Sequence, residues 1–326
     1  MTFNKTLKKN GAAKAKKRKK IIRIASSLFR LFFLIAVSYI VIYPLLYMII
    51  SSISTEEAFL TSRRIWIPSF VTIKYFPLAA KISGYTKALL STLSNEVVAA
   101  VIEVCSCAVA AYGFSRFNFR FKKLFTGMLF LTILIPTSMI IIPLSVNYSH
   151  LDVLGVFGLI KKLSGVDLRI NILNSSWSFW LPSLFAMGLR SGIMIFIYMQ
   201  FFKGLPTEFE EAAYVDGAGP LRTFLQIIIP SSSVVILTVS VFSIIWHWND
   251  YQMATMFMDA NQPLSVGLLG LPDLLQTYGY WISENDPKAI SILMAACVMF
   301  VLPVLVCYLF VQHWFIESVD RVGITG

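Results

Sequence analysis

The sequence is poor in charge and in the residues from which catalytic centres are built. Asp, Glu, Lys and Arg make up only 14% of its 326 residues, whereas soluble domains carry roughly 25%. The three histidines are far apart, and the chain contains no Gly-x4-Gly-Lys-Ser/Thr phosphate loop, no Gly-x-Ser-x-Gly elbow and no HExxH pair. We therefore expect a protein that is not an enzyme and that has no nucleotide site of its own.

Cysteine is also scarce. Cys105, Cys107, Cys297 and Cys307 all lie inside apolar runs. They form no CxxC pair and have no nearby histidine, so they indicate neither a zinc site nor a disulfide framework. We expect no metal site, and we expect the four cysteines to act as small buried hydrophobic residues.

Apolar residues dominate the chain instead. They make up 57% of it, and the mean hydropathy is +0.72. A bilayer core of about 30 Å takes roughly 20 helical residues to cross. Six apolar segments are long enough: 28–52, 90–114, 124–144, 177–202, 227–247 and 289–310. The sequence therefore predicts an all-α, polytopic membrane protein with six transmembrane helices.

The net charge of +11 is unevenly distributed, which suggests an orientation. Ten of the 28 Lys and Arg residues precede Ser26. Such a basic tail could bind nucleic acid or anionic lipid, but we favour the positive-inside rule, which places it in the cytoplasm before the first span. With both termini cytoplasmic, the inner segments hold 17 basic residues and the outer segments hold nine. We expect a basic cytoplasmic tail at 1–27 and a membrane domain at 28–326, with a cytoplasmic loop at 203–226.

The segment EAAYVDGAGPLRTFLQIIIP, Glu211–Pro230, places polar residues between two apolar runs. Thr207 followed by Glu210 fits a capping box and predicts a helix that begins near Glu208. Gly217 can take the left-handed conformation that ends a helix. Pro220 suits the first position of a second helix. We therefore expect a helix, a glycine turn and a second helix that continues into the fifth span.

The first of these helices is short, at about two to three turns, and an isolated helix of that length is marginal in water. Docking against this chain or another would explain why it forms. The alternative is an ordinary interfacial loop that caps two spans, because capping boxes and glycine stops are common punctuation.

The same segment resembles the EAA motif of ABC importer permeases. Glu211-Ala212-Ala213, Gly217 and Pro230 match that motif, and Ile229 stands where it usually has Leu. The stretches 110–119 (AAYGFSRFNF) and 248–268 (WNDYQMATMFMDANQPLSVGL) are similar to carbohydrate-type permeases of the maltose-permease class. The C-terminal residues 315–326 stand where such proteins often end in a Gly-rich tail, so the resemblance covers nearly the whole chain after the basic tail.

This resemblance implies the type I ABC importer permease fold in a bacterial cytoplasmic membrane. It implies a second, homologous permease, two copies of a separate ATP-binding subunit that carries ATP and Mg, and an extracytoplasmic protein that delivers the sugar. The chain itself would need no cofactor. The short helix would be the coupling helix seated on the ATPase. The residues assigned to that coupling are Glu210, Glu211, Ala212, Ala213, Asp216, Gly217, Ala218 and Gly219.

Ionisable groups inside spans are costly, so each is a functional candidate by default. Glu103 and Arg190 are the deepest. They either pair with each other for packing or contribute to the substrate path, and both uses are known for such residues. Glu96 lies nearer the outer end of the second span, where we expect it to face water.

An aromatic and polar cluster spans residues 246–251 at the outer end of the fifth span. Aromatic faces beside hydrogen-bonding groups suit sugar binding, but the interfacial aromatic belt places Trp and Tyr at the same depth. We favour the belt for Trp246 and Tyr251. Trp248, Asn249 and Asp250 are candidates for the substrate path, with a path or gate role favoured for Asn249 and Asp250.

Two other classes of protein remain possible. A gradient-driven secondary transporter or channel would predict inverted repeats and broken helices around buried ion ligands. We see no clear internal repeat, and the Glu211 motif would then lack a purpose. A membrane enzyme would need a catalytic set, and none is visible.

Overall fold

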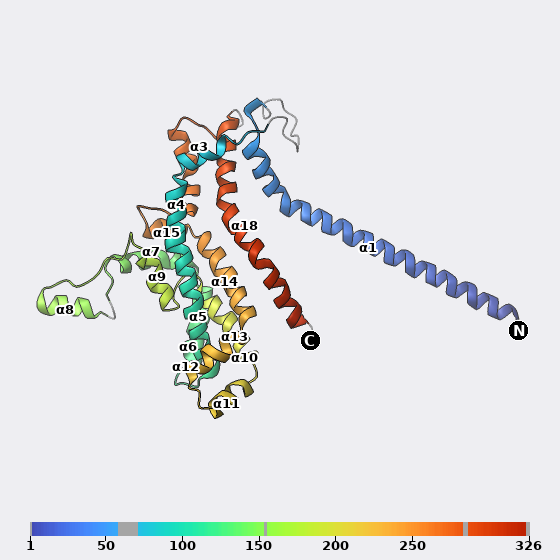
Figure 1. Ribbon diagram of the computed structural model, residues 1–326, viewed down its shortest axis with the longest axis horizontal. Coiled ribbons are helices and arrows are strands. Elements are labelled where there is room, and N and C mark those ends of the chain that lie inside the picture. The colour runs from blue at the N-terminus through green and yellow to red at the C-terminus, as the bar shows by residue number, and fades with distance from the viewer. Residues whose placement is uncertain (1, 58–70, 153–154, 283–285, 324–326) are drawn as a thin grey trace.

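The computed structural model describes residues 2–57, 71–152, 155–282 and 286–323, and the described chain is built almost entirely from helices (Figure 1). Two isolated β-bridges, Ser54 with Val71 and Leu151 with Ile170, are the extended pairings within those ranges. Residues 58–70 of the first outer loop and residues 324–326 of the C-terminal segment lie outside the described residues. In chain order the elements are α1 Thr2–Ile53, α3 Tyr75–Ile82, α4 Tyr85–Ser91, the π-helix η1 Thr92–Val97, α5 Val98–Arg116, α6 Lys122–Leu134, α7 Thr137–Ser149, α8 Val156–Ser164, α9 Trp177–Leu184, α10 Ser191–Gly204, α11 Glu208–Val215, α12 Pro220–Thr223, the π-helix η2 Phe224–Ile228, α13 Ile229–Ser231, α14 Ser233–Trp248, α15 Gln252–Phe257, α16 Leu264–Leu269, α17 Leu271–Thr277 and α18 Pro287–Gly323.

Three helical stretches are long and apolar enough to cross a membrane: Lys19–Ile53, Tyr85–Arg116 and Pro287–Trp314. Two bent pairs also qualify if each counts as one span. Lys122–Leu134 and Thr137–Ser149 meet at 104°, and Pro220–Ser231 and Ser233–Trp248 meet at 81°. The described residues therefore hold three to five candidate spans, which confirms an all-α membrane protein without confirming six spans.

The predicted fourth span, 177–202, is not one helix. It is divided into α9 and α10 by residues 185–190, where Ala186 and Arg190 take positive φ angles of 54° and 60°. A count of apolar residues does not detect this interruption and therefore predicts a single helix. Of the residues in this break, Leu189 is buried, whereas Phe185, Met187 and Arg190 are exposed on this chain. Non-helical backbone at membrane depth is tolerated only against protein or water, so we expect another subunit or a water-filled cavity beside it.

The core lies where α5 packs against α9, α10 and α14. Small residues on α5, including Ala108 and Ala111, face Met194 and Tyr198 of α10 in one buried cluster. Cys107 belongs to this cluster, as expected of a small apolar residue. The same expectation is wrong for Cys105 and Cys307, which lie on the outer surface of this chain.

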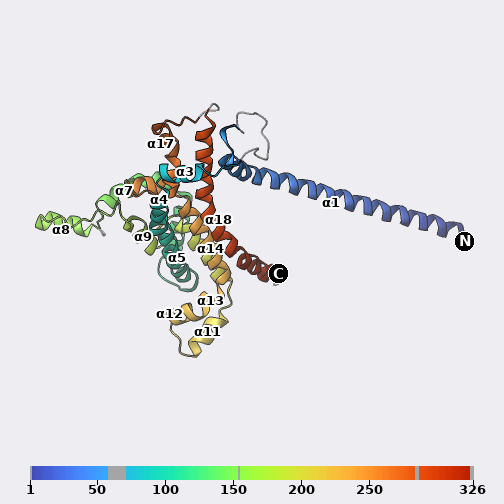
Figure 2. The same ribbon diagram turned by 45° about the horizontal axis from the view of Figure 1, so that its top comes forward.

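The bundle has two distinct ends. Helices α3 and α17 lie at one end, and α11 and α12 lie at the other (Figures 1 and 2). Helix α1 contacts α18 and α3 and projects away from the bundle for most of its length. Its large apolar side chains, such as Phe29, Phe32 and Ile40, are exposed in the single chain, so lipid or another subunit must cover them.

Candidate functional site

Helix α11 begins and ends where local sequence rules place it. The carbonyl of Thr207 accepts the backbone N–H groups of Glu210 and Glu211, both at 3.0 Å. At the other end Gly217 has φ +80°. Its N–H donates to Tyr214 O and the N–H of Ala218 donates to Ala213 O, at 3.0 and 2.9 Å. These two bonds form a Schellman motif, and Pro220 then opens α12.

The predicted capping box does not form. The Thr207 side chain makes no cap hydrogen bond, and the Glu210 carboxylate turns inward instead. Its Oε1 lies 2.8 Å from Nε of Arg116, at the end of α5, although the pair is not aligned as a hydrogen bond. A carboxylate interacts more strongly with a charged partner than with a neutral backbone N–H. The contact of Glu210 with Arg116 therefore forms in place of the capping-box hydrogen bond.

The residues predicted to couple to a motor divide between two faces of the α11 segment. Glu210 and Ala213 are buried against this chain, and Ala218 is half-buried. The exposed members are Glu211, Ala212, Asp216, Gly217 and Gly219. Val215, 87% exposed, and Phe209 add apolar surface next to them. An outer face with small, apolar and acidic side chains suits contact with another subunit, and that role stays a prediction.

Gly217 gives a direct test of this turn. We expect Gly217→Val to destabilise the end of α11 by about 1–2 kcal/mol, because a Cβ is unfavourable in the left-handed region. Gly219→Ala is the matched control: it also has open space around it, but its φ is −79°. Hydrogen exchange should show faster α11 amides only in the Gly217 variant. Equal exchange in both variants would contradict the assignment.

Within the bundle, Glu103 does not pair with Arg190. Arg190 is exposed on this chain, and its guanidinium carbon lies 5.0 Å from the centre of the Trp246 ring. Glu103 is fully buried and accepts a hydrogen bond from Ser191 Oγ. The two side chains point to different partners because Arg190 precedes α10 in a left-handed conformation.

The partner of Glu103 is His247. The Nε2 atom of His247 lies 2.8 Å from Glu103 Oε2, and its Nδ1 lies 3.0 Å from Glu96 Oε2. All three side chains are buried, so the expectation that Glu96 faces water is wrong. We call Glu96, Glu103 and His247 the buried triad. The sequence feature that indicates this cluster is the seven-residue spacing of Glu96 and Glu103. Seven residues are about two helical turns, so both glutamates lie on one face of the helix.

The triad joins separate elements. Glu96 lies in the π-helix η1, Glu103 in α5 and His247 in α14, while Ser191 begins α10. A π-turn in a long helix often marks a functional site. Here it accompanies three buried polar side chains, Thr92, Asn95 and Glu96. A histidine that donates from both ring nitrogens is positively charged and offsets part of the buried negative charge. Together with Ser191, the triad connects the continuous η1–α5 stretch with α10 and α14 at one point.

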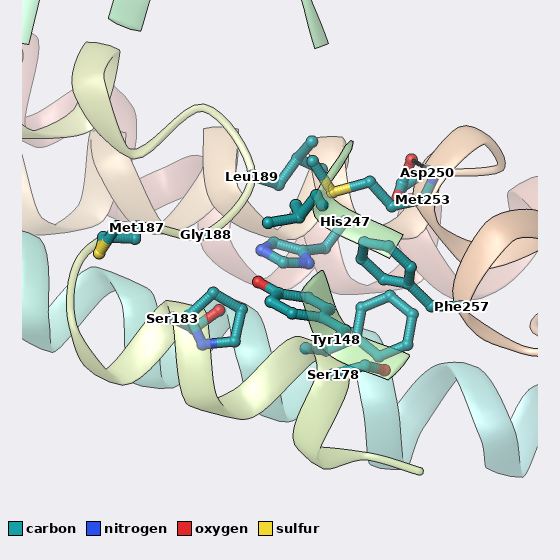
Figure 3. A pocket seen from close by; sticks show the side chains of 13 residues that line it. Tyr148, Ser178, Ser183, Met187, Gly188, Leu189, His247, Asp250, Met253 and Phe257 are labelled. Atoms are coloured by element: carbon teal, nitrogen blue, oxygen red, sulfur yellow. Dashed lines mark hydrogen bonds between the residues drawn. The ribbon is translucent and has the colours of Figure 1, made fainter. Parts of the chain in front are cut away.

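A small cavity adjoins the triad. Its lining includes His247, Asp250, Gly188, Ser183 and Tyr148 (Figure 3). In that view the His247 ring lies in the middle of the labelled side chains. The cavity is about 20 Å³, enough for about one water molecule. A sugar does not fit here in this conformation, so any path at this point is closed.

Gly188 makes the close approach beside the triad possible. A Cβ on this residue would lie 2.7 Å from Ser183 Oγ and 2.8 Å from Glu103 Oε1. We expect Gly188→Ala to lower the free energy of unfolding by about 1–3 kcal/mol through overpacking, measured as a lower thermal midpoint in detergent. Gly113→Ala, a helical position with no neighbour within 4 Å of a new Cβ, is the control. It should be neutral or slightly stabilising, and an equal loss in both variants would contradict the prediction.

The three candidates beyond the triad have different surroundings. Trp248 is buried, and its Nε1 donates to Phe300 O at 3.2 Å. Asn249 is exposed and donates to Ile245 O at 2.8 Å. Asp250 is buried beside the cavity, and burial raises the pKa of its carboxyl above the ordinary value. Of these three, the structure brings only Asp250 to the cavity, and their roles in a substrate path stay predictions.

Long apolar helices packed around a buried polar network define an integral membrane protein. The chain belongs to the family of binding-protein-dependent transport system inner membrane components, whose model matches residues 105–321. It is a permease subunit of that family.

Individual relatives agree with this assignment. A Yersinia pestis bv. Antiqua (strain Antiqua) protein named sn-glycerol-3-phosphate transport system permease protein UgpE is 26% identical over 232 residues, 70% of this chain and 72% of its own length. A Bacillus subtilis (strain 168) protein named polygalacturonan/rhamnogalacturonan transport system permease protein YtcP is 25% identical over 295 residues, 88% and 93% of the two chains. A chain of a bacterial ABC transporter involved in the import of the acidic polysaccharide alginate has a similar fold. Its TM-score is 0.66 at 20% identity, over 89% of this chain and 96% of that one.

Proposed function

We propose that this chain is a membrane-spanning permease subunit of an ATP-driven importer that carries a sugar or oligosaccharide delivered by an extracytoplasmic binding protein. The observation that carries the proposal is α11. It is a short helix with an exposed outer face, held at one end of the bundle by Gly217 and by the Arg116–Glu210 ion pair. The chain contains no phosphate loop, so the ATP and Mg belong to a separate ATP-binding subunit that docks on α11.

The same end of the molecule also supports a membrane arrangement. The cationic loop 115–123 and α11 lie together, and the positive-inside rule assigns such an end to the cytoplasm. We propose six crossings with both termini cytoplasmic, in which α6 with α7, α9 with α10, and α12 to α14 each form one broken crossing. The basic tail 1–27 and the coupling loop 203–226 would then lie on the inner side of a bacterial cytoplasmic membrane, and the membrane domain 28–326 would cross it.

A second, homologous permease would complete the transporter. Helix α1 projects from the bundle for most of its length, and large apolar side chains on it, such as Phe29, Phe32 and Ile40, are exposed in the single chain. A paired membrane subunit together with lipid would bury them. We propose a sugar or oligosaccharide as the substrate because the names of the YtcP protein and of the alginate importer refer to the transport of polysaccharides.

Purification of the full chain from its native membrane tests the proposal. A Walker-type ATPase and a second permease should accompany it. Uptake of radiolabelled mono-, di- and oligosaccharides should stop when cellular ATP is depleted while the ion gradient is maintained. Uptake that continues under those conditions would favour a gradient-driven transporter and overturn the importer.

A further inference from the structure

Arg116, the last residue of α5, contacts both ends of the connection between α10 and α11. Its Nε lies 2.8 Å from Glu210 Oε1 in α11, and its terminal NH2 group donates to the carbonyl of Leu205 at 2.8 Å. Leu205 directly follows α10. One guanidinium at the end of α5 therefore holds the connection between α10 and α11 on both sides.

The contact is protected from water. The side chains of Arg116 and Glu210 are only 11% and 9% exposed, so solvent screens their interaction less than that of a surface pair. Nearby cations are arranged differently. The Arg120 guanidinium lies over the ring of its neighbour Phe121, and Lys122 donates to Phe117 O.

The opposite half of α5 is fastened as well. Glu103 contacts His247 of α14 and Ser191 of α10, and the preceding π-helix supplies Glu96 to the same histidine. Helix α5 is continuous between Glu103 and Arg116. It is therefore a single element with α11 fixed at one end and the buried triad fixed near the other.

We infer that Arg116 is a positioning residue for energy coupling, which transmits displacement of α11 to α5 through Glu210 and the Leu205 carbonyl. The inference rests on the proposed function, because it needs an ATPase that moves α11. In a purely structural role, the Arg116–Glu210 pair would hold the connection between α10 and α11 in place without transmitting movement to α5.

Hydrogen exchange on the complete transporter separates these two roles. The complex is measured without nucleotide and with Mg-ATP plus orthovanadate, and the response is the change in exchange rate of α11 and α5 amides. In the wild type both helices should respond. In Arg116→Gln and in Glu210→Gln, α11 should still respond, while the α5 response should fall by about 10-fold, within the ordinary range of coupling factors.

Three further variants make the result specific. Arg116→Lys keeps the charge but loses the fork that serves two acceptors, so its α5 response should be intermediate. Arg116→Glu combined with Glu210→Arg should recover more of the response than either single reversal. Arg120→Gln removes a charge from the same loop and should behave as wild type.

The outcomes distinguish the inference from the function on which it rests. An undiminished α5 response in Arg116→Gln, with the ATPase bound, overturns the role of Arg116. A parallel loss of response in α11 and α5 also overturns it, because the pair would then only maintain the loop. If no ATPase accompanies the wild-type chain, the proposed function itself fails.

Discussion

Replacing His247 with Ala is expected to lower the free energy of unfolding by about 3–5 kcal/mol, the cost of removing one partner from a buried ion pair. The imidazole is the shared neighbour of Glu96 and Glu103, at 3.0 and 2.8 Å. Without it two buried carboxylates remain. The Glu103 carboxylate keeps Ser191 as a donor, whereas both Glu96 oxygens would lack a partner, because its Oε1 has none already.

Thermal unfolding of the purified chain in detergent measures this effect, together with the yield of folded protein. His150→Ala is the matched control, since His150 is exposed and contacts Ser149. Converting Glu96 and Glu103 to Gln in the His247→Ala background should recover part of the loss by removing the unpaired charges. A midpoint unchanged by His247→Ala would show that the triad carries little of the stability.

The segment from α11 to α12, residues 208–223, is the most predictable part of the molecule, because its signals are local. A glycine that must take a positive φ and a proline at the first helical position lie within a few residues of the structure they specify. Gly217 and Pro220 therefore mark the end of α11 and the start of α12 in both sequence and structure. The prediction of a capping box is wrong, because Arg116, which is distant in sequence, contacts the Glu210 carboxylate instead.

The buried triad could not be read from the sequence with the same certainty. Glu103 and His247 are 144 residues apart, and no local pattern states which elements will meet. Arg190 is predicted at a similar depth in the membrane and is an equally reasonable partner for Glu103. That pairing does not form: the helix is interrupted immediately before α10, and the Arg190 side chain lies over the Trp246 ring. Hydropathy likewise counts apolar residues without seeing breaks, so 177–202 was expected to be one helix.

Ala212 and Ala213 illustrate how the structure refines a motif. The resemblance assigned both to close contact with an ATPase, yet Ala213 is buried within this chain and Ala212 is exposed on α11. Adjacent positions in one helix point about 100° apart. The two alanines should therefore respond to the same substitution in different ways.

We expect Ala212→Arg to weaken binding of the ATPase by about 5- to 140-fold, seen as less ATPase co-purifying with the chain, while the chain itself folds normally. A bulky side chain forced into a fitted interface costs about 1–3 kcal/mol, and each 1.4 kcal/mol is a factor of ten in affinity. Ala213→Arg should instead lower the thermal midpoint of the isolated chain, because it places a charge in the packed interior.

Ala212→Ser provides the matched control, since it keeps a small side chain at the same exposed position and should retain the ATPase. Co-purification is measured from membranes with equal amounts of permease, and thermal unfolding of each variant is measured beside it. Full ATPase retention by Ala212→Arg would exclude the outer face of α11 as the docking surface. Loss of stability in that variant would instead mean that Ala212 packs against this chain, contrary to its exposure.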